Sequence, residues 1–358
     1  VEIKATKAVR TAAPTAAPQE QPKGPTVKGD AFIQAKQGQI AKLSDKEIAL
    51  LKRLIESASK RDPDLADYYY RLAEAYGDKS QYYDFKAREL DQKIFDAKTN
   101  SEKKALQTRQ KNNETEAKKW LTEGVKTYLY VAQSREPQFL QYPKLAHVLF
   151  SLAFLLQQAK KTDEARVFFQ RLIKEYPQSK FIPDAWLSFA EFYFVEGDMA
   201  KALTLYDKVA QYPDSRVFAY AVYKMGWCHI NMQEPDKALR KFVEVIKIAQ
   251  DRKDDPNSKA LEREAKKDVV RAYASVGAPE KAWPFFKDKG GEYAPKMLEM
   301  LAELYFSMGK FAESIKVFRQ LIANTPESER VCAWQNESMK ATLAAGSKAD
   351  QVKEVQRL

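Results

Sequence analysis

Hydrophobic residues recur along most of this chain at the spacing of helix faces, and short polar breaks separate the stripes. The first clear stripe has apolar residues at i, i+3, i+6 and i+7, formed by Ile48, Leu51, Leu54 and Ile55. Ser44, followed three residues later by Glu47, has the pattern of a capping box in front of that stripe. Residues 79–134 contain no proline and have Gly124 as their one glycine, which predicts one long helix or two helices joined near residues 99–101. Asn112-Asn113 is a second possible break.

From about residue 146 the helical pattern repeats. The second helix of each unit opens on a small residue, and these positions are Ala165, Ala202, Ala238, Ala282 and Ser314. Their spacings of 37, 36, 44 and 32 residues scatter around the roughly 34-residue period of a helix–turn–helix repeat. An aromatic residue follows four positions later, at Phe169, Tyr206, Phe242, Phe286 and Phe318. Twelve positions before the aligned residue stands another small residue in four units, namely Ala153, Ala190, Gly226 and Ala302. We interpret these small residues as helix crossings, with the aromatic ring filling the space beside each one.

This pattern resembles the tetratricopeptide repeat (TPR). Pro177 and Pro326 stand at the position of the repeat's final proline, and Pro213 is shifted by one. The unit around Ala282 departs from the pattern, because Pro284 lies inside its second helix. The resemblance implies an all-α, right-handed superhelical solenoid of antiparallel helix pairs, with five to seven units. We expect a disordered Ala/Pro-rich tether at residues 1–30, divergent N-terminal helical repeats with a long helix at 31–140, TPR-like repeats at 141–328, and C-terminal capping helices at 329–358.

A finer resemblance concerns the junctions between units. The segment 172–185 contains Tyr176-Pro177-Gln178-Ser179 and then Ala185, and it looks like the junction of bacterial envelope TPR proteins of the BamD and CpoB type. Residues 188–194 and 220–228 are similar to TPR proteins of gliding-motility envelope complexes. This resemblance implies a periplasmic or outer-membrane-associated protein. A cytoplasmic TPR adaptor or regulator stays open as an alternative.

The composition argues against catalysis. Glycine accounts for 12 of 358 residues, about half its usual share, which disfavours glycine-rich β-sandwiches and Rossmann domains. Cys228 and Cys332 cannot form a disulfide framework or a four-ligand zinc site, and His147 and His229 are the only histidines. We therefore expect no enzyme activity, no metal and no cofactor.

The charge pattern limits the classes of partner that we expect. The net charge is +11, but acidic residues are interleaved with the basic ones and no run of five like charges occurs. Such a pattern is typical of solvated helix faces and argues against nucleic acid as a partner, although an RNA-binding helical repeat stays an alternative. No run of 18 uncharged apolar residues exists, so we expect no membrane-spanning helix, while peripheral membrane association stays open.

The aromatic residues indicate a partner site. In a TPR superhelix, certain positions of each first helix face the concave surface, and exposed apolar groups there often mark a binding site. The predicted partner-binding groove consists of Phe150, Phe154, Leu187, Glu191, Phe194, Tyr220, Tyr223 and Trp227. The alternative is a tightly closed superhelix that buries these side chains against each other. Because of this predicted groove, we expect the protein to be a non-enzymatic scaffold or adaptor that binds segments of other proteins.

Overall fold

The computed structural model describes residues 41–252 and 256–345, together with Val352. Every element in these ranges is helical and no strand occurs among them, which confirms the all-α prediction. The predicted tether at residues 1–30 lies outside the described residues, as does most of the chain after residue 345. The expected division of the chain into domains stays a prediction.

The helices follow one another with short connections. The N-terminal part consists of α1 (Ala41–Ser57), α2 (Leu65–Asp96), α3 (Asn100–Gln133) and α4 (Pro137–Leu140). Three helix pairs follow, α5 (Leu145–Gln158) with α6 (Thr162–Glu175), α7 (Ile182–Val195) with α8 (Met199–Ala210), and α9 (Phe218–Asn231) with α10 (Pro235–Asp251). The chain continues through α11 (Pro256–Val276), the 3-10 turn η3 (Pro279–Lys281), α12 (Ala282–Gly290), η4 (Gly291–Tyr293), α13 (Ala294–Ser307), α14 (Phe311–Asn324) and α15 (Val331–Ala344).

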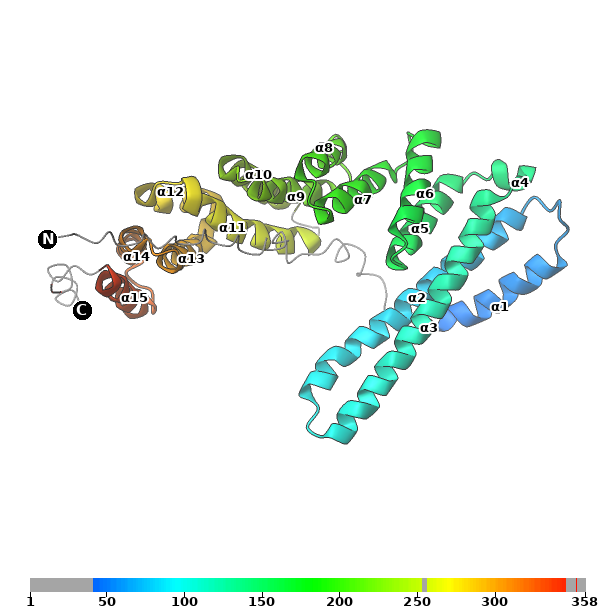
Figure 1. Cartoon of the computed structure of the whole chain (residues 1–358), viewed down its shortest axis with the longest axis horizontal. Helices are drawn as coiled ribbons and strands as arrows, with labels where there is room; N and C mark the ends of the chain where they lie inside the picture. Colours follow the sequence, from blue (N-terminus) through cyan, green and yellow to red (C-terminus); the bar gives the residue numbers. More distant parts are fainter. Residues whose placement is uncertain (1–40, 253–255, 346–351, 353–358) are drawn as a thin grey trace, which may run out of the picture.

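The two longest helices form an antiparallel hairpin that projects away from the row of helix pairs (Figure 1). Of the alternatives left open for residues 79–134, the structure has the break near residue 99, and α3 continues without a break through residues 112–113. The backbone N–H of Glu102 donates to the Thr99 hydroxyl at 3.2 Å, and the N–H of Lys98 donates to the Glu102 carboxylate at 3.3 Å. These two bonds form a variant of the capping box, in which Glu102 binds the residue before the cap, and they fix the turn where α3 starts.

The repeat register is confirmed by burial. The aligned small residues are fully buried, and their aromatic partners four positions later are at most 1% exposed. A methyl group built on Gly226 would lie 2.5 Å from Cε1 of Phe242, so the helices of this pair do touch where the small residue stands. In the last unit the Ser314 hydroxyl donates to the Ala302 carbonyl at 2.8 Å, which explains how a serine can replace the buried alanine.

The turn inside the regular pairs has one recurring geometry. The residue after the cap of each first helix has a positive φ, and these residues are Lys160, Gly197, Gln233 and Gly309. After α5, the N–H groups of Lys160 and Lys161 donate to the carbonyls of Gln157 and Leu156, both at 2.9 Å. This is the hydrogen-bond pattern of a Schellman motif, and it ends the first helix so that the second can fold back.

The unit with the weakest repeat pattern keeps the same packing. Pro284 is the third residue of α12, within the first turn, where a backbone N–H has no partner inside the helix. Ala282 and Phe286 of this unit are both fully buried. The proline therefore does not disturb the helix pair. The larger departure is α11, whose 21 residues make it longer than the other first helices of the solenoid.

Candidate partner-binding surface

The predicted groove residues lie on three successive first helices, but the structure exposes them unequally. Phe150 and Phe154 of α5, with Leu187 and Glu191 of α7, are half-buried. Phe194, at the end of α7, is buried, as are the residues of α9. The surface therefore stays partly open over α5 and α7 and is closed at α9.

The open part is a row of stacked rings, which we call the aromatic strip: His147, Phe150, Phe154 and Phe181. The ring of Phe181 stacks on Phe150 with centroids 4.6 Å apart and on His147 with centroids 4.7 Å apart. Phe150 in turn faces Phe154 at 6.3 Å. Because the rings support one another, little side-chain freedom remains to be lost when a partner covers them.

Phe181 is a functional candidate that the sequence analysis missed. It lies in the junction between α6 and α7, as the residue before the first turn of α7, and not at a first-helix position. The ammonium group of Lys180 lies 5.1 Å from the centre of its ring. The signal was present in the Tyr-Pro-x-Ser junction, which runs directly into Lys180 and Phe181.

The end of the aromatic strip beside α2 is polar. The Tyr70 hydroxyl lies 2.8 Å from Nδ1 of His147 and also hydrogen-bonds to the Glu74 carboxylate. Burial, with smaller effects from Lys180 and Lys144, lowers the pKa of His147, which favours a neutral imidazole at neutral pH. When Tyr70 donates to Glu74, its oxygen can accept from an Nδ1–H of His147, which holds the ring in its stacked position.

Tyr223 and Trp227 correct the prediction of a continuous groove. Both are buried: their rings pack against Phe242 of α10, and Asp268 of α11 binds their polar atoms. The Tyr223 hydroxyl donates to Asp268 at 2.7 Å, and the indole N–H of Trp227 donates to the same oxygen at 3.1 Å. Burial raises the pKa of Asp268 to about 6 despite these bonds and the neighbouring Arg271. The alternative of a closed superhelix is therefore correct at α9.

The prediction that Phe194 and Tyr220 line the groove is corrected for a related reason. Both rings are buried in the core between α7, α8 and α9. The Lys224 ammonium lies 3.5 Å from the centre of the Phe194 ring and 3.1 Å from the Glu191 carboxylate, which also accepts a hydrogen bond from Tyr206. Lys224 is therefore buried and links α7 to α9. Of Phe194, Tyr220, Lys224 and Glu191, only Glu191 lies at the edge of the open surface.

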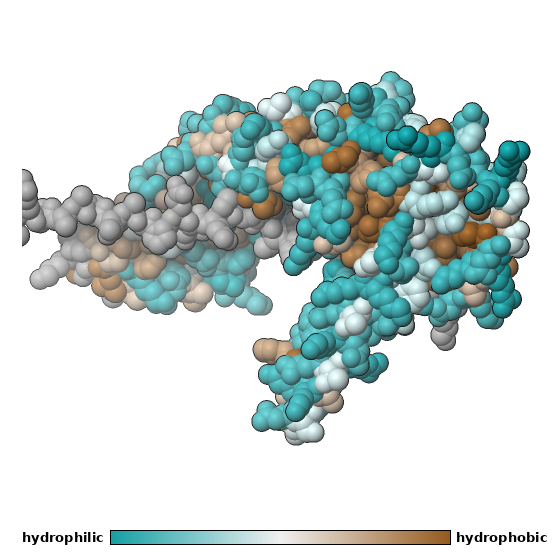
Figure 2. All heavy atoms as spheres, turned by 45° about the vertical axis from the view of Figure 1, so that its right-hand side comes forward, coloured by the Kyte–Doolittle hydropathy of each residue, from teal (hydrophilic) through white to brown (hydrophobic). Residues whose placement is uncertain are grey.

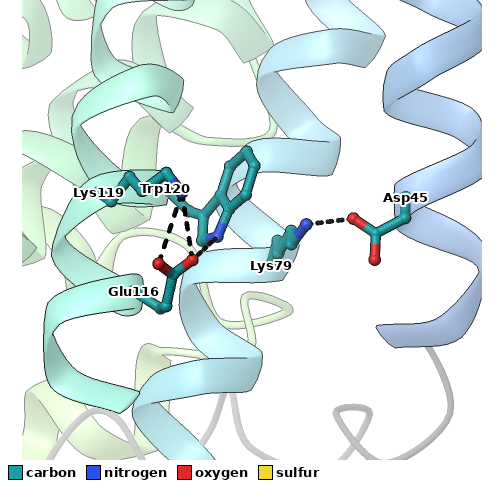
Figure 3. Close-up of polar contacts among 5 residues, drawn as sticks. All are labelled: Asp45, Lys79, Glu116, Lys119 and Trp120. Carbon is teal, nitrogen blue, oxygen red and sulfur yellow. Dashed lines mark hydrogen bonds and ion pairs between the residues drawn. The ribbon is translucent and has the colours of Figure 1, made fainter. Parts of the chain in front are cut away.

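A second polar cluster connects α1 to the hairpin (Figure 3). Lys79 forms an ion pair with Asp45, and its ammonium lies 3.8 Å from the centre of the Trp120 ring. The Trp120 indole N–H donates to Glu116 at 3.0 Å, and Lys119 pairs with the same carboxylate at 3.4 Å. Each of these charges has a partner inside the cluster, which therefore fastens α1 to the hairpin.

Few other side chains in the described ranges are candidates for catalysis or metal binding. Burial raises the pKa of the Cys228 thiol to about 12, so it is protonated at neutral pH and is no nucleophile. His229 Nδ1 lies 2.7 Å from Glu234, so this contact joins the last turn of α9 to the N-cap of α10. Among the residues that the structure describes, no group of three His, Cys, Asp or Glu side chains could hold a metal ion. No helix in those ranges is long and apolar enough to cross a membrane.

Comparisons with known proteins agree with the helix pairs. Two tetratricopeptide repeat family models match residues 147–179 and 295–328, which correspond to α5–α6 and α13–α14. A model of anaphase-promoting complex subunit 5 matches residues 198–258. A comparison with curated protein sequences gives no significant match.

Two solved structures are similar at low identity. A tetratricopeptide repeat protein from Parabacteroides merdae is 18% identical, with a TM-score of 0.36, and the match covers 76% of this chain and 91% of that one. The APC/C hetero-tetramer Cut9-Hcn1 is 13% identical, with a TM-score of 0.30, over 91% of this chain and 62% of that one. Solenoids built from the repeats that match residues 147–179 and 295–328 bind other proteins through extended surfaces, so the chain is a protein-interaction scaffold. From the matched repeats and the confirmed register, the chain is a tetratricopeptide repeat protein.

Proposed function

We propose that this scaffold binds an extended apolar segment of a partner protein along the aromatic strip. The observation that carries the proposal is the row of half-buried, mutually stacked rings on α5 and at the start of α7. Figure 2 shows hydrophobic side chains gathered in a hollow in the right-hand part of the molecule, beside the hairpin. A partner that covers such rings gains buried apolar area without first having to order them.

The charged groups beside the aromatic strip would set the direction of the bound segment. Lys180 lies at the ring of Phe181 and forms no ion pair with another residue in the described ranges. Glu191 stands on the side of α9, and its charge is shared with Lys224. A partner segment with an acidic group near Lys180 and apolar side chains beyond it would match this arrangement, and the charges would contribute mostly to orientation.

We also propose that the scaffold works in a bacterial envelope complex, such as a gliding-motility machinery. The support is the likeness of the junction at residues 176–185 to envelope TPR proteins. The test is to fractionate the native host and to locate the chain with an antibody. Detection in the periplasmic or outer-membrane fraction would support this setting, and detection in the cytoplasmic fraction alone would contradict it.

Peptide selection on the full chain tests the binding surface. Peptides are selected from a random display library, and their affinities are then measured for variants by fluorescence anisotropy. We expect Phe150→Ala with Phe154→Ala to weaken binding by about 2 kcal/mol or more, as for hot-spot anchors. The matched control is Val167→Ala on α6, which removes an exposed apolar group elsewhere and should leave the affinity unchanged.

The folding of each variant must be checked on the same samples. Circular dichroism should show unchanged helicity for the double variant, because both rings are only half-buried. If the selected peptides bind the double variant and the wild type equally well, the aromatic strip is not the site. If Val167→Ala weakens binding as much, the peptides bind the outer helices instead.

A further inference from the structure

The far end of the α2–α3 hairpin carries an exposed aromatic residue. Phe95 lies in the last turn of α2 and is 84% exposed, the largest value for any large hydrophobic residue that the structure describes. The capping box at Thr99 starts α3 only a few residues later, so the ring stands beside a fixed turn. An apolar surface that covers this exposed ring would gain the free energy of its burial.

Basic residues surround this ring. Residues 86–111 contain eight Lys or Arg and four Asp or Glu, a net charge of +4. The acidic side chains are engaged nearby: Asp96 accepts from Gln92 at 2.9 Å, and Asp91 accepts from Gln110 at 2.6 Å. Glu102 belongs to the capping box and Glu89 pairs with Lys86 at 2.8 Å.

Six of the cations have no such partner. Within the described part of the chain, no ion pair is formed by Lys93, Lys98, Lys103, Lys104, Arg109 or Lys111. All six are exposed. The end of the hairpin therefore presents unpaired positive charge around one apolar ring, which complements a surface that is negatively charged and has an apolar interior.

We propose that the hairpin tip, defined as residues 93–104, docks on an anionic lipid membrane, with Phe95 inserted among the headgroups and the lysines against the lipid phosphates. The shape favours a flat surface over a ligand. In Figure 1 the hairpin ends as a convex rod, away from the helix pairs, and Figure 2 shows it standing out from the body. A convex end cannot enclose a peptide or a small molecule, whereas it can meet a bilayer without a clash of the solenoid.

The hairpin also separates this contact from the aromatic strip. At about 1.5 Å per residue, the 32 residues of α2 give a rod of roughly 48 Å. Tyr70, which contacts the strip at His147, lies near the start of that rod, and Phe95 lies at its end. A protein segment bound at the strip and a membrane bound at the tip would therefore not compete for space.

Vesicle co-sedimentation of the full chain tests the proposal. The probes are vesicles of equal parts phosphatidylglycerol and phosphatidylcholine, compared with vesicles of phosphatidylcholine alone. We expect binding to the anionic vesicles only, and weaker binding as salt rises. Lys98→Glu, Lys103→Glu and Lys104→Glu together should lower the partition coefficient by at least about a hundredfold, because several attractive charges become repulsive. Phe95→Ser should lower it by about fivefold, through loss of the inserted ring.

The charge variant should still fold. Lys103 and Lys104 lie in the first turns of α3, where acidic side chains interact favourably with the helix dipole, and Lys98 lies in the turn. The matched control is Lys174→Glu, Lys247→Glu and Lys259→Glu, which changes the net charge equally at exposed positions of other helices. Val195→Ser is the control for Phe95→Ser, since Val195 is 77% exposed on α7.

Insertion of the ring has its own measurement. In Phe95→Trp, lipids with brominated acyl chains should quench more tryptophan fluorescence than in the wild type. Absence of added quenching would overturn insertion, and equal losses from the tip and control triplets would overturn the tip as the site. A wild type that ignores anionic vesicles but binds an RNA homopolymer through the same lysines would overturn the membrane proposal and assign the tip to nucleic acid.

Discussion

The crossing of α9 and α10 gives the sharpest test of the repeat register. Gly226 stands at the small-residue position of α9, opposite the Phe242 ring of α10. A methyl group at this glycine would lie 2.5 Å from Cε1, 2.8 Å from Cδ1 and 3.0 Å from Cζ of that ring. Neighbouring rings restrict any movement, because the centroids of Tyr223 and Trp227 lie 5.8 Å and 6.3 Å away from that of Phe242. Even Gly226→Ala should therefore force a rearrangement.

Two effects of opposite sign decide the magnitude. In a helix interior, replacing glycine with alanine usually stabilises by about 0.5–1 kcal/mol, because the unfolded chain loses freedom. Overpacking of a buried site costs about 1–3 kcal/mol. At Gly226 the second effect should win, so we expect Gly226→Ala to lower the free energy of unfolding by about 1–2 kcal/mol. Gly226→Leu should lower it further.

Gly77 provides a matched control within α2. There a methyl group would lie 3.8 Å and 3.9 Å from two carbons of Leu155, which is ordinary contact. Gly77→Ala should thus raise the free energy of unfolding by about 0.5–1 kcal/mol. Urea unfolding followed by circular dichroism measures both variants, and hydrogen exchange should place the damage from Gly226→Ala near α9 and α10. A Gly226→Ala variant as stable as the wild type would refute the crossing, and Phe242→Leu should relieve the defect.

The remaining predictions concern single contacts. Gln233→Gly should raise the free energy of unfolding by about 0.5–1 kcal/mol, because its φ of 59° favours glycine, and a thermal melt that shows no gain would contradict this. Because the pKa of Asp268 in the folded chain is raised to about 6, the folded chain binds more protons than the unfolded one between about pH 4 and 6. Stability should therefore fall by about 2–3 kcal/mol as pH rises through this window, and urea titrations of Asp268→Asn should lack that component. Trp227→Ala should cost about 3–5 kcal/mol of unfolding free energy, and a melt that shows a stable variant would contradict its place in the core.

The sequence predicted the helix pairs well because their packing is local and repeated. A small residue and an aromatic sixteen positions later recur in four units, and the structure buries every one of these pairs. The same register could not predict which first-helix faces stay open. Tyr223 and Phe150 occupy equivalent positions, yet only Tyr223 is covered, because Asp268 comes from a helix that does not follow the repeat. The irregular spacing of 44 residues before Ala282 was the one sign of that helix in the sequence.

The repeat pattern could not predict contacts between elements that are distant in the sequence either. Lys79 and Trp120 lie on opposite helices of the hairpin, and Asp45 reaches them from α1. Periodicity predicts which face of each helix is apolar, but it gives no information on which charged side chain of another helix will lie against it. Phe181 was missed for a similar reason, since it acts from a junction and not from the periodic part of a helix.

Closure of the surface at α9 limits how tightly the aromatic strip can bind. With helices packed about 8–10 Å apart, a strip over two first helices spans roughly 20 Å. An extended peptide covers this distance with about six residues, at about 3.3 Å per residue. So short a contact buries too little area for tight binding alone, and a longer peptide would gain nothing at α9, where Lys224 and Asp268 already close the surface.

The hairpin offers a second contact that adds to this weak binding. If its tip holds the scaffold at a membrane that also carries the partner, the second contact forms within one assembly, and its effective concentration replaces the missing contact area. A weak strip and a weak tip on one chain then suffice for an assembly that either would fail to hold alone.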